Sequence, residues 1–170
     1  GHYGLSKLTV LWDDNHISID GDTALSFSED VLKRFQAYGW AVRRVDGHDA
    51  GELAAAMSWA MRNRKPTLIA CRTIIGLGAP TKAGTAGSHG APLGAAEAAA
   101  AKQALGWTAA PFEVPADIKA LWESAGKRGA GARRSWLKRI AKHPQRAEFE
   151  RAMAGRLPEA WNEALSALRA

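Results

Sequence analysis

The sequence predicts an α/β fold in which a parallel sheet with flanking helices is followed by a helical extension. Three short runs rich in strand-forming residues, at positions 8–12, 40–45 and 66–72, are separated by segments with helical spacing. Strands that alternate with helical segments of about ten or more residues are typical of parallel sheets. Beyond position 94 the pattern turns helical and remains so, which predicts a second region without strands.

The first strand is expected at residues 8–12, an apolar run that ends at the triplet Asp-Asp-Asn of residues 13–15. Aspartate and asparagine favour turns, so the triplet predicts a loop. Ser28 is the expected N-cap of the next helix, because two acidic residues then stand in its first turn. Gly39 predicts the end of that helix.

The second strand, at residues 40–45, leads into a helix whose expected N-cap is Asp49. An apolar stripe at helical spacing is expected to face the core, formed by Leu53, Met57 and Met61. The third strand, at residues 66–72, completes a β-α-β-α-β order. Ligands of parallel sheets bind at the carboxyl ends of the strands, so residues 13–15 and the segment after residue 72 lie where a site is expected.

Residues 74–94 predict a long loop, because they contain six glycines and two prolines. Loops longer than about 15 residues in compact domains are usually functional or disordered. An alanine-rich helix is expected at residues 95–104, and another begins at Pro115. We therefore divide the chain into a first domain, residues 1–107, and a helical extension, residues 108–170.

The composition is that of a water-soluble globular protein, since the 170 residues are 46% hydrophobic and 24% charged. No apolar run approaches the roughly 18 residues that a membrane-spanning helix needs, and no membrane partner is expected. The single cysteine, Cys71, excludes a disulfide within the chain. It lies in an apolar run and is expected to be a buried strand residue, which fits a reducing, cytoplasmic location.

The net charge of +6 and the pI of about 9.8 suggest an alternative function, a basic module that binds nucleic acid or another polyanion. Residues 127–146 carry eight Lys or Arg and no Asp or Glu. A solvated helical face is the simpler interpretation. Apart from Trp136, the stretch lacks the aromatic residues on which bases stack, so we expect no nucleic-acid partner.

Residues 13–23 offer oxygen atoms suited to a magnesium ion, which takes about six oxygen ligands, often from a few protein groups, phosphate and water. The side-chain oxygen of Asn15 and the backbone carbonyl of Ile17 stand at a spacing that can serve one ion. An Asx turn, in which the Asn15 side chain accepts a hydrogen bond from its own backbone, explains the same pattern. The spacing leaves both interpretations open.

Several ordered blocks of the sequence resemble the transketolase family. The string Asp-Asp-Asn-His-Ile-Ser-Ile-Asp-Gly-Asp-Thr at residues 13–23 resembles the second half of the family's thiamine diphosphate motif. Further blocks follow in the family's order at residues 34–40, 46–49, 72–80, 87–94, 105–107 and 112–115. The likeness covers nearly the whole chain and fades after residue 126. It implies that residues 1–107 are the second half of the diphosphate-binding domain and that residues 108–170 lead to the linker between domains.

The resemblance implies thiamine diphosphate as cofactor, held with Mg²⁺ (or Ca²⁺). By it, Asn15 binds the metal and contacts the diphosphate, and Ile17 binds the metal through its backbone oxygen. Ile19 is expected to pack against the cofactor's central ring. His89 is expected to contact the diphosphate, to lie beside the substrate and to act in catalysis.

The resemblance also implies an enzyme, a homodimer when complete, that transfers a two-carbon ketol unit from a ketose phosphate to an aldose phosphate. The string at residues 13–23 favours transketolase over dihydroxyacetone synthase or deoxyxylulose-phosphate synthase. The family motif opens with a Gly-Asp-Gly whose aspartate also binds the metal, and a later domain supplies the glutamate that activates the cofactor. Neither is in this sequence, so we expect an incomplete fragment that is inactive by itself.

Three further polar residues near these blocks have simpler expected roles. We expect His16 to face solvent and His48 to organise the turn before Asp49. Lys82 either approaches an anion or is solvated.

Overall fold

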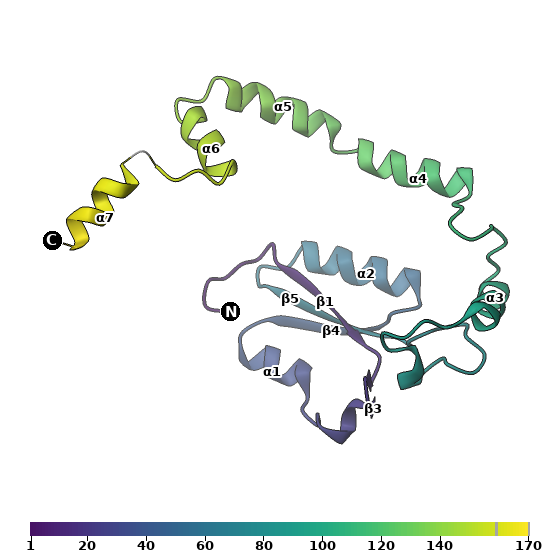
Figure 1. The fold of residues 1–170 in the computed structure, drawn as a ribbon. Coiled ribbons are helices and arrows are strands. Elements are labelled where there is room, and N and C mark those ends of the chain that lie inside the picture. The colour runs from purple at the N-terminus through teal and green to yellow at the C-terminus, as the bar shows by residue number, and fades with distance from the viewer. Residues whose placement is uncertain (159, 170) are drawn as a thin grey trace. The chain divides into compact units, whose positions relative to one another are not determined.

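The computed structural model describes residues 1–158 and 160–169, which form two compact units (Figure 1). The first unit is Gly1–Thr108 and the second is Ala109–Ala170. Among the described residues, no helix combines the length and the apolar character that crossing a bilayer requires.

The first unit is built on a three-stranded parallel sheet with the order β1-β5-β4. Its strands are β1 (Thr9–Asp14), β4 (Ala41–Asp46) and β5 (Thr67–Arg72). Thr67 of β5 pairs with the first residue of each neighbour, so the three carboxyl ends lie at one edge of the sheet. The predicted parallel sheet is confirmed, and its central strand is the one with the most continuous run of buried residues.

The two helices that connect the strands lie on opposite faces of the sheet (Figure 1). Helix α1 (Val31–Ala37) joins β1 to β4, and α2 (Ala50–Met61) joins β4 to β5. Both connections link parallel strands, which requires a crossover long enough to hold a helix. The flanking helices predicted from the sequence are thereby confirmed.

The start of α1 differs from the expectation, because Asp30 and not Ser28 is its N-cap. The Asp30 carboxylate accepts a hydrogen bond of 3.0 Å from the backbone N–H of Lys33. Either residue can cap a helix, and the one that does is the one in extended conformation beside the first helical residue. Gly39, with φ of 82°, ends the segment as predicted, and Asp49 caps α2 as predicted through Glu52.

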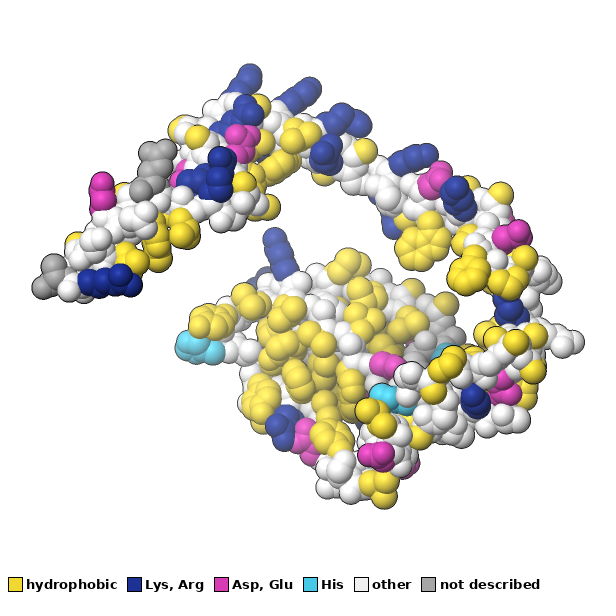
Figure 2. Space-filling view, in the orientation of Figure 1, with side chains coloured by type: hydrophobic (Ala, Val, Ile, Leu, Met, Phe, Trp, Pro, Cys, Tyr) yellow, Lys and Arg dark blue, Asp and Glu magenta, His cyan; other side chains and the backbone are white. Residues whose placement is uncertain are grey.

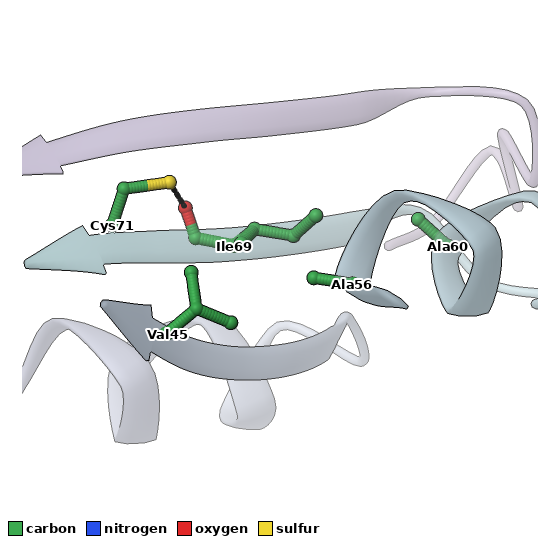
Figure 3. Close-up of a cluster of buried hydrophobic side chains, with 5 residues drawn as sticks. All are labelled: Val45, Ala56, Ala60, Ile69 and Cys71. Carbon is green, nitrogen blue, oxygen red and sulfur yellow. Dashed lines mark hydrogen bonds between the residues drawn. The ribbon is translucent and has the colours of Figure 1, made fainter. Parts of the chain in front are cut away.

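The core beneath α2 packs two alanines of the helix against side chains of β4 and β5 (Figure 3). Its buried members are Val45, Ala56, Ala60, Ile69 and Cys71. The expected stripe of Leu53, Met57 and Met61 is wrong, because Met57 is 38% and Met61 77% exposed, and of the three only Leu53 packs against the core. The alanine face lies on β5 because small side chains allow a helix to approach a sheet closely, and hydrophobicity alone does not identify that face.

Strand β1 continues through residues 13 and 14, where the sequence predicted a turn. Asp13 pairs with Cys71 and Asp14 with Arg72, so the backbone stays in the parallel ladder. The turn begins only at Asn15. A short hairpin follows, formed by β2 (Ile17–Ser18) and β3 (Gly21–Asp22), and then the 3-10 helix η1 (Thr23–Leu25).

The rest of the first unit is the loop after β5 and a helix. The loop contains the short 3-10 helix η2 (Ala86–Ser88), and α3 (Ala95–Ala104) has the predicted bounds.

The described residues of the second unit form helices joined by turns and loops and contain no strand, as predicted. It consists of α4 (Ala116–Lys127), α5 (Ala130–Ala141), α6 (Arg146–Met153) and α7 (Trp161–Arg169). Lys and Arg side chains project along α5 and its flanks (Figure 2). On α5, Trp136 contacts Phe149 of α6 edge to face, with ring centroids 5.7 Å apart.

Candidate functional site

A cavity of about 800 Å³ opens at the carboxyl end of β1. It is lined by β1, by the turn that follows it, by the start of α1 and by His89 from the distant loop. Asn15, Ile17 and His89, which lie up to 74 positions apart in the sequence, therefore border one space. Ile19 is not among the lining residues, and its side chain is 72% exposed beside the hairpin.

One side of the cavity is apolar and the other polar. Val10, Phe35 and Leu68 form an apolar wall between the sheet and α1. The polar end carries Asp14 and Asp22, together with the turn residues. A space with an apolar wall and a few convergent polar groups is the usual form of a cofactor site.

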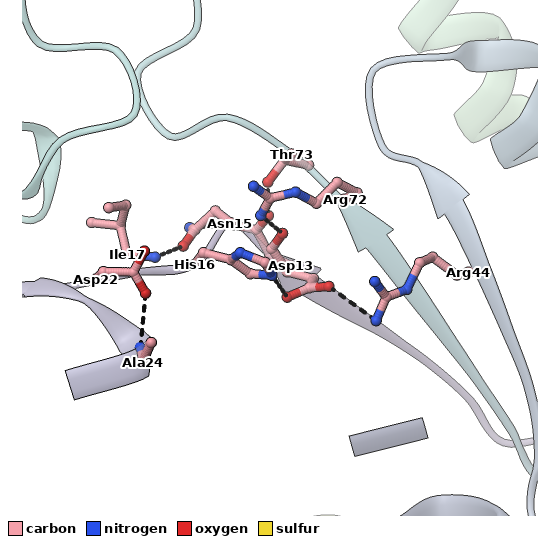
Figure 4. A network of polar contacts seen from close by, with 10 residues as sticks. Asp13, Asn15, His16, Ile17, Asp22, Ala24, Arg44, Arg72 and Thr73 are labelled. Carbon is pink, nitrogen blue, oxygen red and sulfur yellow. Dashed lines mark hydrogen bonds and ion pairs between the residues drawn. The ribbon is translucent and has the colours of Figure 1, made fainter. Parts of the chain in front are cut away.

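The turn after β1 is an Asx turn, the alternative that the sequence left open (Figure 4). The backbone N–H of Ile17 donates to Asn15 Oδ1 at 2.9 Å, and Asn15 Nδ2 donates to Asp13 Oδ2 at 3.2 Å. These bonds hold the amide with its oxygen toward residue 17. An amide oxygen has two lone pairs, so one remains for a cation after the bond to Ile17. The two interpretations are therefore compatible.

Asp14 is a buried carboxylate at the cavity, with a relative exposure of 3%. Its Oδ1 lies 3.2 Å from His16 Nε2, and its Oδ2 lies 3.6 Å from Arg44 Nη2. Within the described residues, Oδ2 accepts no hydrogen bond. His16 is exposed as expected, with 49% of its side chain accessible, and its backbone adopts φ of 61°, which places the ring beside the Asp14 carboxylate. This cluster could not be predicted from the sequence, because no local pattern shows that the Asp14 side chain faces inward.

The carboxyl ends of β1 and β5 are tied together by side chains (Figure 4). Arg72 Nη1 donates to the backbone oxygen of Asp14 at 2.7 Å, and the Thr73 hydroxyl donates to the Asp13 carboxylate. These contacts fix the backbone immediately before Asn15 against the central strand. The site thus rests on the most buried strand of the sheet.

His48 organises its turn as predicted and also reaches the next one. Its backbone N–H donates to Asp46 Oδ1 at 2.8 Å, and its Nε2 accepts from the backbone N–H of Ile74 at 2.8 Å. The histidine therefore anchors the start of the loop that carries His89.

His89 is exposed at the end of η2 and faces the cavity. The ammonium group of its loop neighbour Lys82 donates to the backbone oxygens of Pro92 at 3.2 Å and Leu93 at 3.0 Å. The lysine therefore binds its own loop.

The turn offers oxygen atoms, which are the ligands that hard divalent cations such as Mg²⁺ prefer. Within the part of the chain that the structure describes, no group of three or more His, Cys, Asp or Glu side chains is placed to hold a metal ion. A magnesium ion is often bound by one or two protein groups together with phosphate oxygens and water. The oxygens of Asn15 and Ile17 fit that pattern as a partial ligand set.

Comparison with known proteins defines the class of this domain. The family described as transketolase, thiamine diphosphate binding domain, matches residues 1–158. A transketolase of Cereibacter sphaeroides is 53% identical over 154 residues, which are 91% of this chain and 23% of that protein. The plasmid-encoded transketolase of Cupriavidus necator is 53% identical over 175 aligned residues, covering 99% of this chain and 26% of that protein.

Solved transketolases share the fold. A structure from Campylobacter jejuni superimposes with a TM-score of 0.80 at 36% identity, covering 89% of this chain and 24% of that one. A transketolase of Pichia stipitis in complex with sedoheptulose 7-phosphate gives a TM-score of 0.83 at 38% identity, covering 96% of this chain and 25% of that one.

The family match and the shared fold thus define a thiamine diphosphate-binding domain. The chain belongs to the transketolase family, whose members are transferases. It spans about a quarter of the length of the relatives that it matches.

Proposed function

We propose that this chain anchors the metal and diphosphate ends of thiamine diphosphate in an enzyme that transfers a two-carbon ketol unit from a ketose phosphate to an aldose phosphate. The observation that carries the proposal is the meeting of Asn15, Ile17 and His89 at one cavity. Identities above 50% to transketolases over nearly the whole chain support the reaction class. By the same analogy, the complete protein acts as a homodimer in the cytoplasm.

In this proposal the turn after β1 binds the metal. Asn15 offers its side-chain oxygen and Ile17 its backbone oxygen to Mg²⁺ (or Ca²⁺), and the diphosphate and water complete the shell. The bond from Ile17 N–H to Asn15 Oδ1 orients the amide in advance, so little side-chain freedom is lost on binding. Asn15 also donates toward the diphosphate.

Ile19 and His89 act on the organic part of the site. Ile19 is an exposed apolar side chain two residues beyond Ile17, and it packs against the cofactor's central ring. His89 donates a hydrogen bond to the diphosphate or to a substrate hydroxyl and moves a proton at that hydroxyl. When bound, thiamine diphosphate supplies the nucleophilic carbon that carries the two-carbon unit.

The proposal includes the expectation that the 170-residue chain alone does not turn over substrate. The family's Gly-Asp-Gly aspartate and its cofactor-activating glutamate are not in this sequence. Incubation of the purified chain with thiamine diphosphate, Mg²⁺, xylulose 5-phosphate and ribose 5-phosphate tests this point. Turnover in that mixture contradicts it.

A chimera tests the site residues. The segment of the Cereibacter sphaeroides transketolase that this chain matches is replaced by this chain, and ketol transfer is measured against cofactor concentration. Asn15→Ala should raise the cofactor concentration needed for half-maximal activity, with Asn162→Ala in α7 as the matched control. If the Asn15 variant needs no more cofactor than its parent, the ligand assignment is wrong.

The alternative function, a polyanion-binding module, has less support. The basic stretch contains a single Trp, Phe or Tyr residue, Trp136, and this residue already contacts Phe149 edge to face. A salt-sensitive shift of DNA mobility by the full chain would revive this alternative.

A further inference from the structure

The segment around His89, residues 81–93, is held in place by hydrogen bonds of side chains to which the proposed function assigns no role. We propose that Glu97 and Lys82 are positioning residues that hold His89 at the cavity. This inference rests on the role proposed above for His89. Both residues act through the backbone of the loop, and neither lines the cavity.

Glu97 joins the beginning of the segment to α3. Its Oε1 accepts the backbone N–H groups of Thr81 at 2.7 Å and Lys82 at 3.1 Å, and its Oε2 accepts the Thr81 hydroxyl at 3.1 Å. The hydrogen bond from the Thr81 N–H, the largest cause, holds the pKa of Glu97 below its ordinary value. The carboxylate is therefore bound as an anion, with its negative charge in the first turn of a helix.

Lys82 joins the beginning of the segment to its later part. Its ammonium group bridges the backbone oxygens of Pro92 and Leu93, three and four residues beyond His89. Its backbone oxygen accepts the hydroxyl of Ser88 at 2.6 Å, immediately before His89. One lysine thus binds the chain on both sides of the histidine.

Gly76, near the start of the loop, lies against Ser88, the residue before His89. Its φ of 64° lies in the left-handed region, and a Cβ there would stand 2.5 Å from Ser88 Oγ and 3.1 Å from Ser88 Cβ. The glycine therefore permits a close approach to Ser88 beside the backbone of Lys82, whose oxygen would lie 3.6 Å from the same Cβ. It offers an independent way to disturb the same position.

The need for such a clamp follows from the exposure and composition of the segment. His89 is exposed, so packing does not fix it. Residues 74–94 include six glycines, and ordering each flexible residue costs conformational entropy. A displacement of about 1 Å at a reacting group can lower a rate roughly 100-fold. Hydrogen bonds that hold the loop in place therefore affect the position of His89 and its proposed catalytic role.

The first experiment measures amide hydrogen exchange of the full chain. Glu97→Ala should raise exchange at Thr81, at Lys82 and across residues 82–93, and leave β5 unchanged. Glu97→Gln keeps an oxygen for the two backbone N–H groups and should restore most of the protection. Lys65→Met, an exposed lysine outside the loop, is the control for Lys82→Met. Unchanged exchange across residues 82–93 in both Glu97→Ala and Lys82→Met overturns the proposal.

The second experiment uses the chimera and a double-mutant cycle. Glu97→Ala and Gly76→Ala should each lower kcat roughly 10- to 100-fold, with a smaller change in KM. Neither should lower it further in a His89→Ala background, because both act through the histidine. Additive losses in that background overturn the clamp. If His89→Ala alone leaves kcat and KM unchanged, the proposed role of His89 fails, and the exchange data still decide whether the clamp exists.

Discussion

The carboxylate of Asp14 and the guanidinium of Arg44 lie 3.6 Å apart, although the whole of β5 separates their strands. Arg44 pairs with Ala70, and Asp14 lies two residues beyond the partner of Ala70 on the other side. All three side chains therefore share the α1 face of the sheet. Because Ala70 is small and fully buried, the arginine can extend over it to the carboxylate.

We predict that Arg44→Gln lowers the free energy of unfolding by about 1 kcal/mol, because it leaves the buried Asp14 carboxylate without a positive charge. The value is modest because the arginine side chain is 56% exposed. Urea unfolding of the full chain measures it. In an Asp14→Asn background the same substitution should cost little.

Arg43→Gln is the matched control for this pair. Arg43 lies on the other face of the sheet, 5.1 Å over the ring of Trp59. Its effect should be independent of Asp14. Equal coupling of Arg43 and Arg44 to Asp14 would mean that the 3.6 Å contact has no specific effect on stability.

We predict that Gly47→Ala destabilises the first unit by about 1–3 kcal/mol through overpacking. A Cβ at this position would overlap the Thr73 methyl group and lie 3.0 Å from the backbone oxygen of Arg72. Thr73→Ser removes that methyl group and should recover part of the loss in the double variant.

Gly126→Ala in α4 is the control, because the space around its Cβ is open. That change should be neutral or stabilising, since alanine favours helices. Equal losses of stability for Gly47→Ala and Gly126→Ala would contradict the steric explanation.

We predict that Asp30 makes stability depend on pH in the acid range. The hydrogen bond from the Lys33 N–H, the largest cause, lowers the pKa of Asp30 from its ordinary 3.8. The folded chain then binds fewer protons than the unfolded chain, so this contribution is present above about pH 4 and is lost as the pH falls below it. Asp30→Asn should flatten the dependence of the Tm on pH in that range. Ser28→Ala should leave the Tm and its pH dependence unchanged, whereas Asp30→Ala should lower the Tm. If Ser28→Ala lowers the Tm as much as Asp30→Ala does, Ser28 is the cap.

We predict that Cys71 reacts slowly with thiol reagents in the folded chain. Burial, and secondarily the nearby negative charge of Asp13, raises the pKa of the Cys71 thiol. Less thiolate is therefore present, and the sulfur is also shielded. With a chromogenic disulfide reagent at about pH 8, Cys71 should react far more slowly than the thiol of glutathione. In urea, which unfolds the chain, Cys71 should react at the glutathione rate. Equal rates without urea would contradict the burial.

The alternation of strands and helices could be predicted because its signals are local. The expected strand at residues 66–72 is one residue longer than β5, and the helix at residues 95–104 is α3. Asp49 and Gly39 act where expected, because a cap depends on backbone groups only a few residues away. The candidate site was identified through its resemblance to a family, since the Asn15 turn has two explanations when only its spacing is considered.

The sequence by itself determined the parallel α/β class, the position of its strands and the family of the chain. The tertiary structure alone decided which face of α2 is buried, that Asp14 points inward toward Arg44, and that Lys82 binds its own loop. The physical reason is the range of the interactions. Helical and strand periodicity and caps act over a few residues, whereas these three outcomes depend on which distant segments become neighbours across the sheet and the loop.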